Sequence, residues 1–220
     1  ATSIITLLAV TADDDAAAVV NVAWPQVVAM IAMIGVALIA AVCDWRTKNV
    51  PNQVTYPAIV GGLVYWAAVG LAGAGAVESG GLAGAWSGLQ PALLAAAVAF
   101  VPTAILFAMG GLGGGDVKLV TAIGALSADW RCAIMAIFIG FLVGAAISIV
   151  VMIRRRIVKQ TANRVYNAAL MAIFRVKGTL PDDSPRIPLA VGFAVGAIVA
   201  GFEYLLGVPM PWSAWESPGW

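Results

Sequence analysis

Histidine is absent from this chain of 220 residues, and its absence excludes several kinds of chemistry. Without histidine there is no Ser-His-Asp triad, no Cys-His pair, no H-E-x-x-H zinc helix and no histidine-ligated haem. The two cysteines, Cys43 and Cys132, form neither a CxxC zinc pair nor a disulfide framework. Any catalytic chemistry must therefore use carboxylates, hydroxyls, lysine or single thiols.

Charged side chains are also scarce, at 10% of the chain against 62% for hydrophobic residues. A soluble domain carries roughly a quarter charged residues, so this chain lacks the polar groups that would cover a surface in water. The mean hydropathy of +0.96 agrees. The net charge of +1 gives no indication of a nucleic-acid partner. The composition therefore predicts an integral membrane protein, surrounded by membrane lipid and built as one helical bundle.

Six apolar stretches are candidates for transmembrane helices, since a span needs about 20 mostly apolar residues. They are Pro25–Cys43, Val54–Gly75, Gln90–Met109, Asp116–Ala128, Cys132–Ile153 and Ile187–Leu206. The fourth is short, and it crosses the bilayer only if the glycine-rich residues 110–115 before it also lie at membrane depth. The prediction is an all-α, polytopic bundle of about six transmembrane helices.

Basic residues predict the orientation of the bundle, because Lys and Arg concentrate in cytoplasmic loops. Arg46 and Lys48 follow the first span, and Lys118 opens the fourth. The connection between the fifth and sixth spans carries Arg154, Arg155, Arg156, Lys159, Arg164, Arg175, Lys177 and Arg186. With these residues in the cytoplasm, the N-terminus and the C-terminus both lie outside.

The domain organisation follows from this topology. Residues 25–206 form the membrane domain, which includes a cytoplasmic segment at 154–186. Residues 1–24 and 207–220 are expected to be external tails. Within the cytoplasmic segment, apolar residues recur at near-helical spacing among the basic ones. Two interpretations remain open for it: an amphipathic helix lying on anionic lipid, or a plain basic loop.

Two aspartates, Asp44 and Asp116, are the main functional candidates, because a carboxylate at membrane depth is costly. Asp44 ends the first span, which runs inward, and Asp116 begins the fourth, which runs outward. Both therefore lie at the cytoplasmic boundary. Two carboxyl groups in close contact share one proton: the ionised one accepts a proton from water, while the protonated one polarises a peptide carbonyl. Such a pair hydrolyses peptides without a metal or a cofactor.

Glycines precede the second aspartate directly, at Gly113, Gly114 and Gly115. They allow backbone conformations that a Cβ would forbid, and they let an extended substrate approach closely. The simpler alternative is a flexible turn between two helices.

These residues also carry a family resemblance. The stretch Asp44–Asn52 (D-W-R-T-K-N-V-P-N) resembles the D-x-[KR]-x-x-x-I-P-N signature of type IV prepilin peptidases, with Val50 in place of Ile. Gly113–Leu119 (G-G-G-D-V-K-L) resembles their G-x-G-D-x-K-L signature. Pro188 and Gly192 resemble the late P-x-x-x-G element. The chain is most similar to the short form of this family, which lacks the zinc-binding methyltransferase domain, as in Flp-type prepilin and archaeal preflagellin peptidases.

The resemblance implies an aspartic endopeptidase of the inner membrane, with Asp44 and Asp116 as the catalytic pair and no cofactor or metal. Its partner is a prepilin-like or preflagellin-like precursor, whose leader is cut after a glycine at the cytoplasmic face. The remaining signature residues are expected to bind substrate or to shape the loops: Arg46, Pro51, Asn52, Gly113, Gly115, Lys118, Pro188 and Gly192. Arg46 and Lys118, each two residues from an aspartate, either influence the shared proton, fix a loop or simply anchor the helix ends.

Two other classes of function are compatible with buried carboxylates. A proton- or ion-coupled transporter would use Asp44 and Asp116 as carriers, but transporters place such groups near the midplane, between inverted repeats. A non-catalytic scaffold would use them as helix caps. A cap explains Asp116 at the start of a helix and does not explain Asp44 at the end of one. The peptidase is the better prediction.

Overall fold

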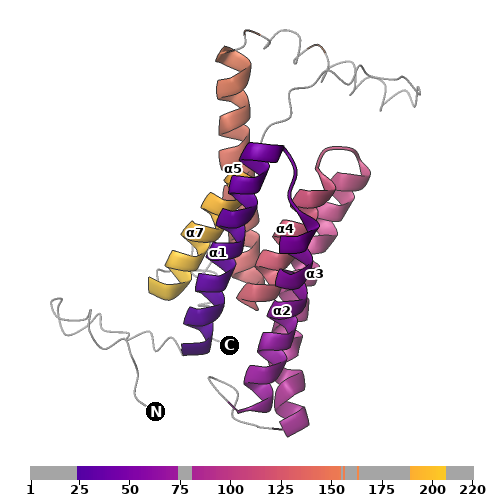
Figure 1. The fold of residues 1–220 in the computed structure, drawn as a ribbon, viewed down its shortest axis with the longest axis vertical. Helices are drawn as coiled ribbons and strands as arrows, with labels where there is room; N and C mark the ends of the chain where they lie inside the picture. The colour runs from indigo at the N-terminus through magenta and orange to yellow at the C-terminus, as the bar shows by residue number, and fades with distance from the viewer. Residues whose placement is uncertain (1–23, 74–80, 155, 157–162, 164–188, 207–220) are drawn as a thin grey trace, which may run out of the picture.

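The computed structural model describes residues 24–73, 81–154, 156, 163 and 189–206, which contain no strand. Their helices are α1 (Trp24–Thr47), α2 (Asn52–Leu71), α3 (Gly81–Ala108), α4 (Gly114–Ser127), α5 (Trp130–Arg154) and α7 (Leu189–Leu206). Figure 1 shows them as one elongated bundle. The all-α prediction is confirmed. The two tails, Pro188 and nearly all of the segment after Arg156 lie outside the described residues.

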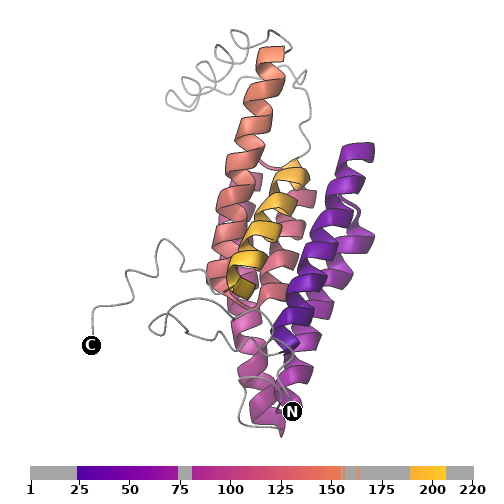
Figure 2. The ribbon, with the colours of Figure 1, turned by 90° about the vertical axis from the view of Figure 1, so that its left-hand side faces the viewer.

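Successive helices run in opposite directions along the long axis of the bundle (Figure 1). One end, here called the upper end, carries the connections 48–51 and 109–113 together with the start of α7. The last turns of α5 project beyond the other helices at this end, and α7 lies between α5 and α1 (Figure 2). Residues far apart in the sequence therefore meet at the upper end.

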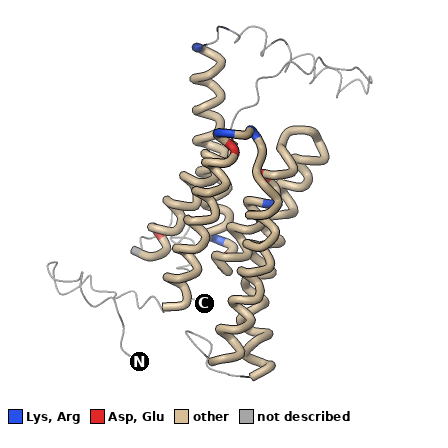
Figure 3. The backbone as a smooth tube through the Cα atoms, in the orientation of Figure 1, with Lys and Arg blue, Asp and Glu red and all other residues tan. Residues whose placement is uncertain are grey.

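Charged residues of the described helices gather mainly at the same upper end (Figure 3). Those at the upper end are Asp44, Arg46, Lys48, Asp116, Lys118, Arg154 and Arg156, and those at the lower end are Asp129, Arg131 and Glu203. The helix directions thus reproduce the charge asymmetry of the sequence. Which end faces the cytoplasm stays a prediction that rests on this asymmetry.

Four helices, α1, α2, α3 and α5, are long and apolar enough to cross a membrane, and α7 is a shorter apolar helix. The chain is therefore a multi-pass membrane protein. At 14 residues, α4 extends about 21 Å, less than the roughly 30 Å of a hydrocarbon core. The glycine-rich stretch before α4 is a non-helical connection from residue 109 to 113.

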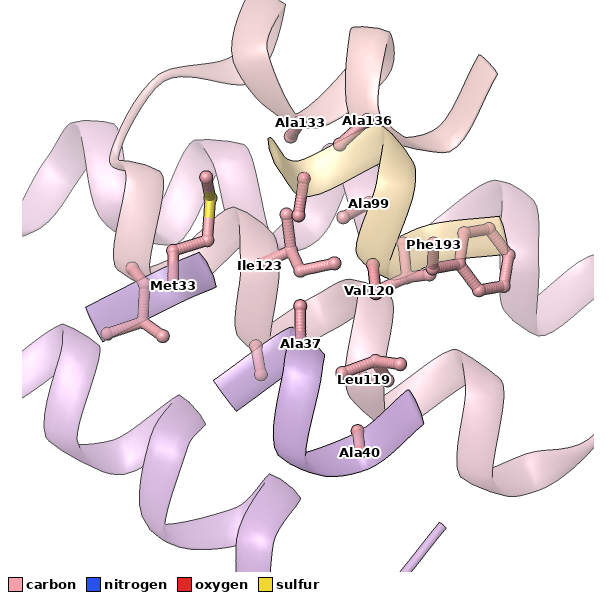
Figure 4. Close-up of a cluster of buried hydrophobic side chains, with 14 of the residues drawn as sticks. Met33, Ala37, Ala40, Ala99, Leu119, Val120, Ile123, Ala133, Ala136 and Phe193 are labelled. Atoms are coloured by element: carbon pink, nitrogen blue, oxygen red, sulfur yellow. The ribbon is translucent and has the colours of Figure 1, made fainter. Parts of the chain in front are cut away.

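The short α4 is the central helix of the bundle and contacts all five other described helices. Figure 4 shows its side chains in the core, which includes Leu119, Val120 and Ile123 of α4, Met33, Ala37 and Ala40 of α1, Ala99 of α3, Ala133 and Ala136 of α5, and Phe193 of α7. Small residues allow helices to approach closely where lipid supplies no hydrophobic driving force. The start of α4 is thereby fixed relative to its neighbours.

Glycines mediate the closest helix contacts. On α5 and α7 they are spaced four apart, as Gly140 and Gly144 on one helix and Gly192 and Gly196 on the other. A Cβ at Gly192 would lie 2.5 Å from the Gly140 carbonyl oxygen. Such small-xxx-small pairs bring two helix backbones into direct contact. This contact sets the position of α7.

The structure corrects one predicted boundary. α3 begins at Gly81, nine residues before the expected start at Gln90. Gly84 and Gly88 give this stretch a low helix propensity. Both lie against α2, where a Cβ at Gly88 would overlap the Trp66 carbonyl oxygen. Close packing against α2 explains why the stretch is helical.

Candidate active site

Asp44 lies in the last turn of α1, and only 8% of its surface is exposed. The helix ends just beyond it, where the Lys48 N–H donates to the Asp44 carbonyl oxygen at 2.9 Å. Lys48 has a φ of 56°, the left-handed conformation that commonly terminates a helix. The chain then turns through Asn49 and Val50 to the N-cap of α2 at Pro51. The Asp44 side chain is thus held at the rim of the upper end.

The Asp44 carboxylate lies against the start of α7. Its Oδ2 accepts a hydrogen bond from the backbone N–H of Ala190 at 3.3 Å. Ala190 is the second residue of α7 and is fully buried. The first N–H groups of a helix have no partner within the helix, and the helix dipole favours an anion there. This contact explains how a carboxylate is accommodated at the otherwise unfavourable C-terminal end of α1.

Asp116 lies in the first turn of α4, three residues after its N-cap, Gly113. The N–H groups of Asp116 and Val117 donate to the Gly113 carbonyl oxygen at 3.1 and 3.3 Å. The Asp116 side chain turns back over the cap, because a Cβ built on Gly113 would lie 2.9 Å from Asp116 Oδ2. Asp116 is therefore also at a helix N-terminus, where the dipole favours negative charge.

One cavity of about 540 Å³ brings the two aspartates together. Its lining comes from two regions of the upper end. The end of α1 and the connection after it supply Asp44, Lys48, Asn49 and Val50, and the connection before α4 together with the first turn of α4 supplies Gly110, Gly111, Leu112, Gly113, Gly114, Gly115 and Asp116. The volume falls in the range of ligand-binding pockets. The sequence predicts that Asp44 and Asp116 lie at the same end of the bundle, and their place in one cavity lining agrees with that prediction.

The glycines of the connection before α4 and of the first turn of α4 have separate roles. Gly110 adopts a φ of +77°, which L-residues rarely adopt, and so makes the turn after α3. Gly115 packs against the first connection, since a Cβ there would lie 3.0 Å from Val50 Cβ. Val50 is only 5% exposed. Gly115 therefore joins the two halves of the cavity, while Gly113 leaves room for the Asp116 carboxyl group.

Gly113→Ala is expected to lower kcat ten- to hundredfold, because the new methyl group would displace the Asp116 carboxyl group and small misplacements of a reacting group are costly. Gly113 itself has φ −76° and ψ 143°, which alanine adopts freely, so folding should be unaffected. Gly111→Ala is the control in the same connection, since its Cβ would meet only the Leu106 carbonyl oxygen at 3.5 Å. Equal rates for the two variants in a peptide-cleavage assay would contradict the placement of Asp116.

Lys118 joins α4 to α2. Its Nζ donates to Asn52 Oδ1 at 2.8 Å and lies 4.7 Å from the centre of the Tyr56 ring. Lys118 is absent from the cavity lining, as are Asn52 and Pro51, which start α2. Arg46 is exposed in the last turn of α1, where a cation interacts favourably with the helix dipole. Of the alternatives for Lys118, the geometry favours fixing the two helix starts.

Lys118→Gln is accordingly expected to leave the pH–rate profile of peptide cleavage unshifted and to lower the free energy of unfolding by about 0.5–1 kcal/mol. A double-mutant cycle with Asn52→Ala should show coupling of similar size, because the two side chains form one hydrogen bond. The measurements are thermal unfolding in detergent micelles and initial rates across pH. A shifted profile would instead place Lys118 in the proton chemistry.

Two signature residues fall elsewhere. Gly192 is buried at the contact between α5 and α7 and is absent from the cavity lining. Pro188 is outside the described residues. Conversely, sequence reasoning missed two contributors. Lys48 lines the cavity, and its spacing of four residues from Asp44 was a usable signal. Ala190 contributes a backbone N–H, for which the sequence carries no signal.

Among the described residues, no group of three or more Cys, Asp or Glu side chains is placed to hold a metal ion. The cavity is lined by two carboxyl groups, the Lys48 and Asn49 side chains and the backbone at the start of α4, and the Ala190 N–H contacts one of the carboxyl groups. These groups transfer protons and bind oxygen atoms.

Comparison with known proteins gives one match. The model of the type IV leader peptidase family matches residues 31–149, more than half of the chain. The match includes both aspartates and both connections that line the cavity, and it ends before α7. Among curated proteins and among solved structures, none matches the chain.

Proposed function

Because the chain belongs to the type IV leader peptidase family, we propose that it is an aspartic endopeptidase that removes the leader from prepilin-like or preflagellin-like precursors by cutting after a glycine. The observation that carries this proposal is the convergence of Asp44 and Asp116 on one cavity at the upper end of the bundle. A peptidase is the function that the family supplies, and the paired carboxyl groups give it a mechanism.

Hydrolysis in this proposal uses the two carboxyl groups together. Two neighbouring carboxyl groups hold one proton between them, so one is ionised and the other is protonated. The ionised group removes a proton from water, and the resulting hydroxide attacks the peptide carbonyl carbon. The protonated group donates a hydrogen bond to the carbonyl oxygen. Lys48 lines the same cavity and offsets the one negative charge that the pair retains.

The substrate class follows from the position of the site. The cavity lies at the end of the bundle beside apolar helices, so a substrate with a polar leader and an apolar segment would place the apolar segment in the bilayer. Residues 110–116 supply five glycines and few side chains to the lining, which leaves space for an extended peptide backbone. We place the protein in the inner membrane with this end in the cytoplasm, where the basic residues of α1, α4 and α5 gather.

A transporter is the less favoured function. The aspartates lie at one end of the bundle, whereas carrier carboxylates of transporters lie near the midplane. Membership of a peptidase family also argues against transport.

Incubation of the purified protein in detergent micelles with a synthetic prepilin peptide, followed by mass spectrometry, tests the proposal. The peptide carries a basic leader, a glycine at the junction and an apolar segment. We expect cleavage directly after the glycine. A preparation carrying both Asp44→Asn and Asp116→Asn controls for contaminating proteases. Cleavage that persists in this double variant, or an intact peptide with the wild type, would contradict the proposal.

A further inference from the structure

The start of α7 distinguishes the two aspartates from each other. Asp44 is buried and accepts the Ala190 N–H from a different helix. Asp116 is more exposed and lies in the first turn of its own helix, turned back over Gly113. The family match ends at residue 149 and does not extend to α7. The contact between Asp44 and Ala190 is therefore known from the structure and not from the family match.

A backbone N–H can only donate, so the Asp44 oxygen that receives it must be an acceptor. A hydrogen bond of this kind favours the ionised form of a carboxyl group over its protonated form, and the dipole at the start of α7 acts in the same direction. Asp116 has a comparable environment at the start of α4, where it also accepts a backbone hydrogen bond from Gly113. Asp44 differs in having the positive charge of Lys48 beside it as well. The three effects at Asp44 together direct the proton that the pair shares to Asp116. Among the described residues, the charged groups that line the cavity with Asp44 are Asp116 from α4 and Lys48 from the connection after α1.

The position of this N–H is fixed by packing. At the first turn of α7, the Leu189 side chain fills the space where a Cβ of Gly144 would be. One turn later, Gly192 lies directly against the backbone of α5 at Gly140. The first turn of α7 thus packs on α5, and the Ala190 N–H is held toward Asp44 of α1.

We propose that Ala190 is a positioning residue of the active site: its backbone N–H holds Asp44 as the carboxylate, so that Asp44 serves as the base and Asp116 as the acid. This division of roles rests on the proposed peptidase function. In the first step, Asp44 takes a proton from water as the water oxygen bonds to the peptide carbon, and Asp116 gives its proton to the carbonyl oxygen. In the second, Asp44 gives its proton to the amide nitrogen as the C–N bond breaks, and Asp116 regains a proton from one hydroxyl of the intermediate. The products are a carboxylic acid and an amine, and both aspartates return to their starting states.

Ala190→Pro tests the positioning role, because proline removes the N–H yet is tolerated in the first turn of a helix. The expected result is a lower kcat and an acidic limb of the pH–rate profile that moves to higher pH by roughly one unit. KM should change little, since the N–H contacts Asp44 and not the substrate. Val191→Pro is the matched control, because it makes the same change one residue further on. Similar profiles for the two proline variants would overturn the proposal.

A second measurement needs no variant of α7, so it remains decisive if Ala190→Pro does not fold. The amide resonance of Ala190 is followed by NMR in the wild-type protein as the pH is lowered. We expect it to move with the ionisation that limits activity, and we expect Asp44→Asn to abolish this movement. An Ala190 resonance that does not respond over the pH range in which activity rises would overturn the proposal.

The same NMR titration separates this proposal from the proposed function, because it uses no substrate. A responding Ala190 amide in a protein that leaves prepilin peptides intact would support the hydrogen bond and refute the peptidase assignment. A protein that cleaves the peptide while its Ala190 amide does not respond would refute only the division of roles.

Discussion

Asp44→Asn and Asp116→Asn are each expected to lower the rate of peptide cleavage by roughly three orders of magnitude or more, as in other catalytic units whose members act together. Asparagine keeps the shape of aspartate and can neither accept nor supply the shared proton. In Asp44→Asn, the amide oxygen can still accept the Ala190 N–H that now binds Oδ2. The variants should therefore remain folded and inserted, which circular dichroism and gel filtration in detergent would establish.

Asp129→Asn is the control for this pair. Asp129 lies at the lower end of the bundle, where its Oδ1 accepts the Arg131 N–H at 2.7 Å at the start of α5. Asparagine is an equally good residue at such a position, so activity should match the wild type. Cleavage near the wild-type rate by either Asp44→Asn or Asp116→Asn would remove that residue from the mechanism.

Gly192→Ala is expected to lower the free energy of unfolding by about 1–3 kcal/mol, the cost of overfilling a packed interior. The new Cβ would lie 2.5 Å from the Gly140 carbonyl oxygen and 3.1 Å from the Gly144 nitrogen, so α7 would have to move away from α5. That movement would also carry Ala190 away from Asp44. We therefore expect a loss of kcat together with a lower unfolding temperature in detergent.

Two other glycines serve as controls for Gly192→Ala. Gly35→Ala adds a Cβ with nothing within 4 Å, and should be neutral or stabilising by up to about 1 kcal/mol. In α7 itself, Gly201→Ala would meet only side-chain ends, Ile34 Cδ1 at 3.2 Å and Met33 Cε at 3.3 Å, which can adjust. If Gly192→Ala behaved like these two, the close approach of α5 and α7 would be wrong.

Much of the site was predictable from the sequence, because the order of apolar stretches along the chain determines at which end of the bundle each connecting residue lies. Counting apolar stretches assigns Asp44 and Asp116 to the same end of the bundle before any fold is known. The structure confirms the helical bundle, and both aspartates line one cavity. The glycines before Asp116 also indicated a connection at residues 110–115, because a cluster of glycines interrupts a helix within an apolar region.

The sequence did not predict how the helices contact each other. The early start of α3 at Gly81 contradicts helix propensity and depends on a close contact with α2. Hydropathy also does not predict the central position of α4, because a short apolar helix has the same hydropathy whether lipid or protein surrounds it. Lys118 likewise gains its role only when α2 brings Asn52 within hydrogen-bond distance.

The sequence by itself thus determined that this is a membrane-embedded bundle with two carboxyl groups at one end, because hydropathy and charge act residue by residue along the chain. Only the tertiary structure decided that α7 supplies a donor to Asp44, since Ala190 lies 146 residues further along the chain and contributes a backbone group that every residue except proline possesses. The physical reason is that burial in lipid is a property of a segment, whereas a hydrogen bond between two helices depends on their relative position, which here is set by glycine contacts between α5 and α7.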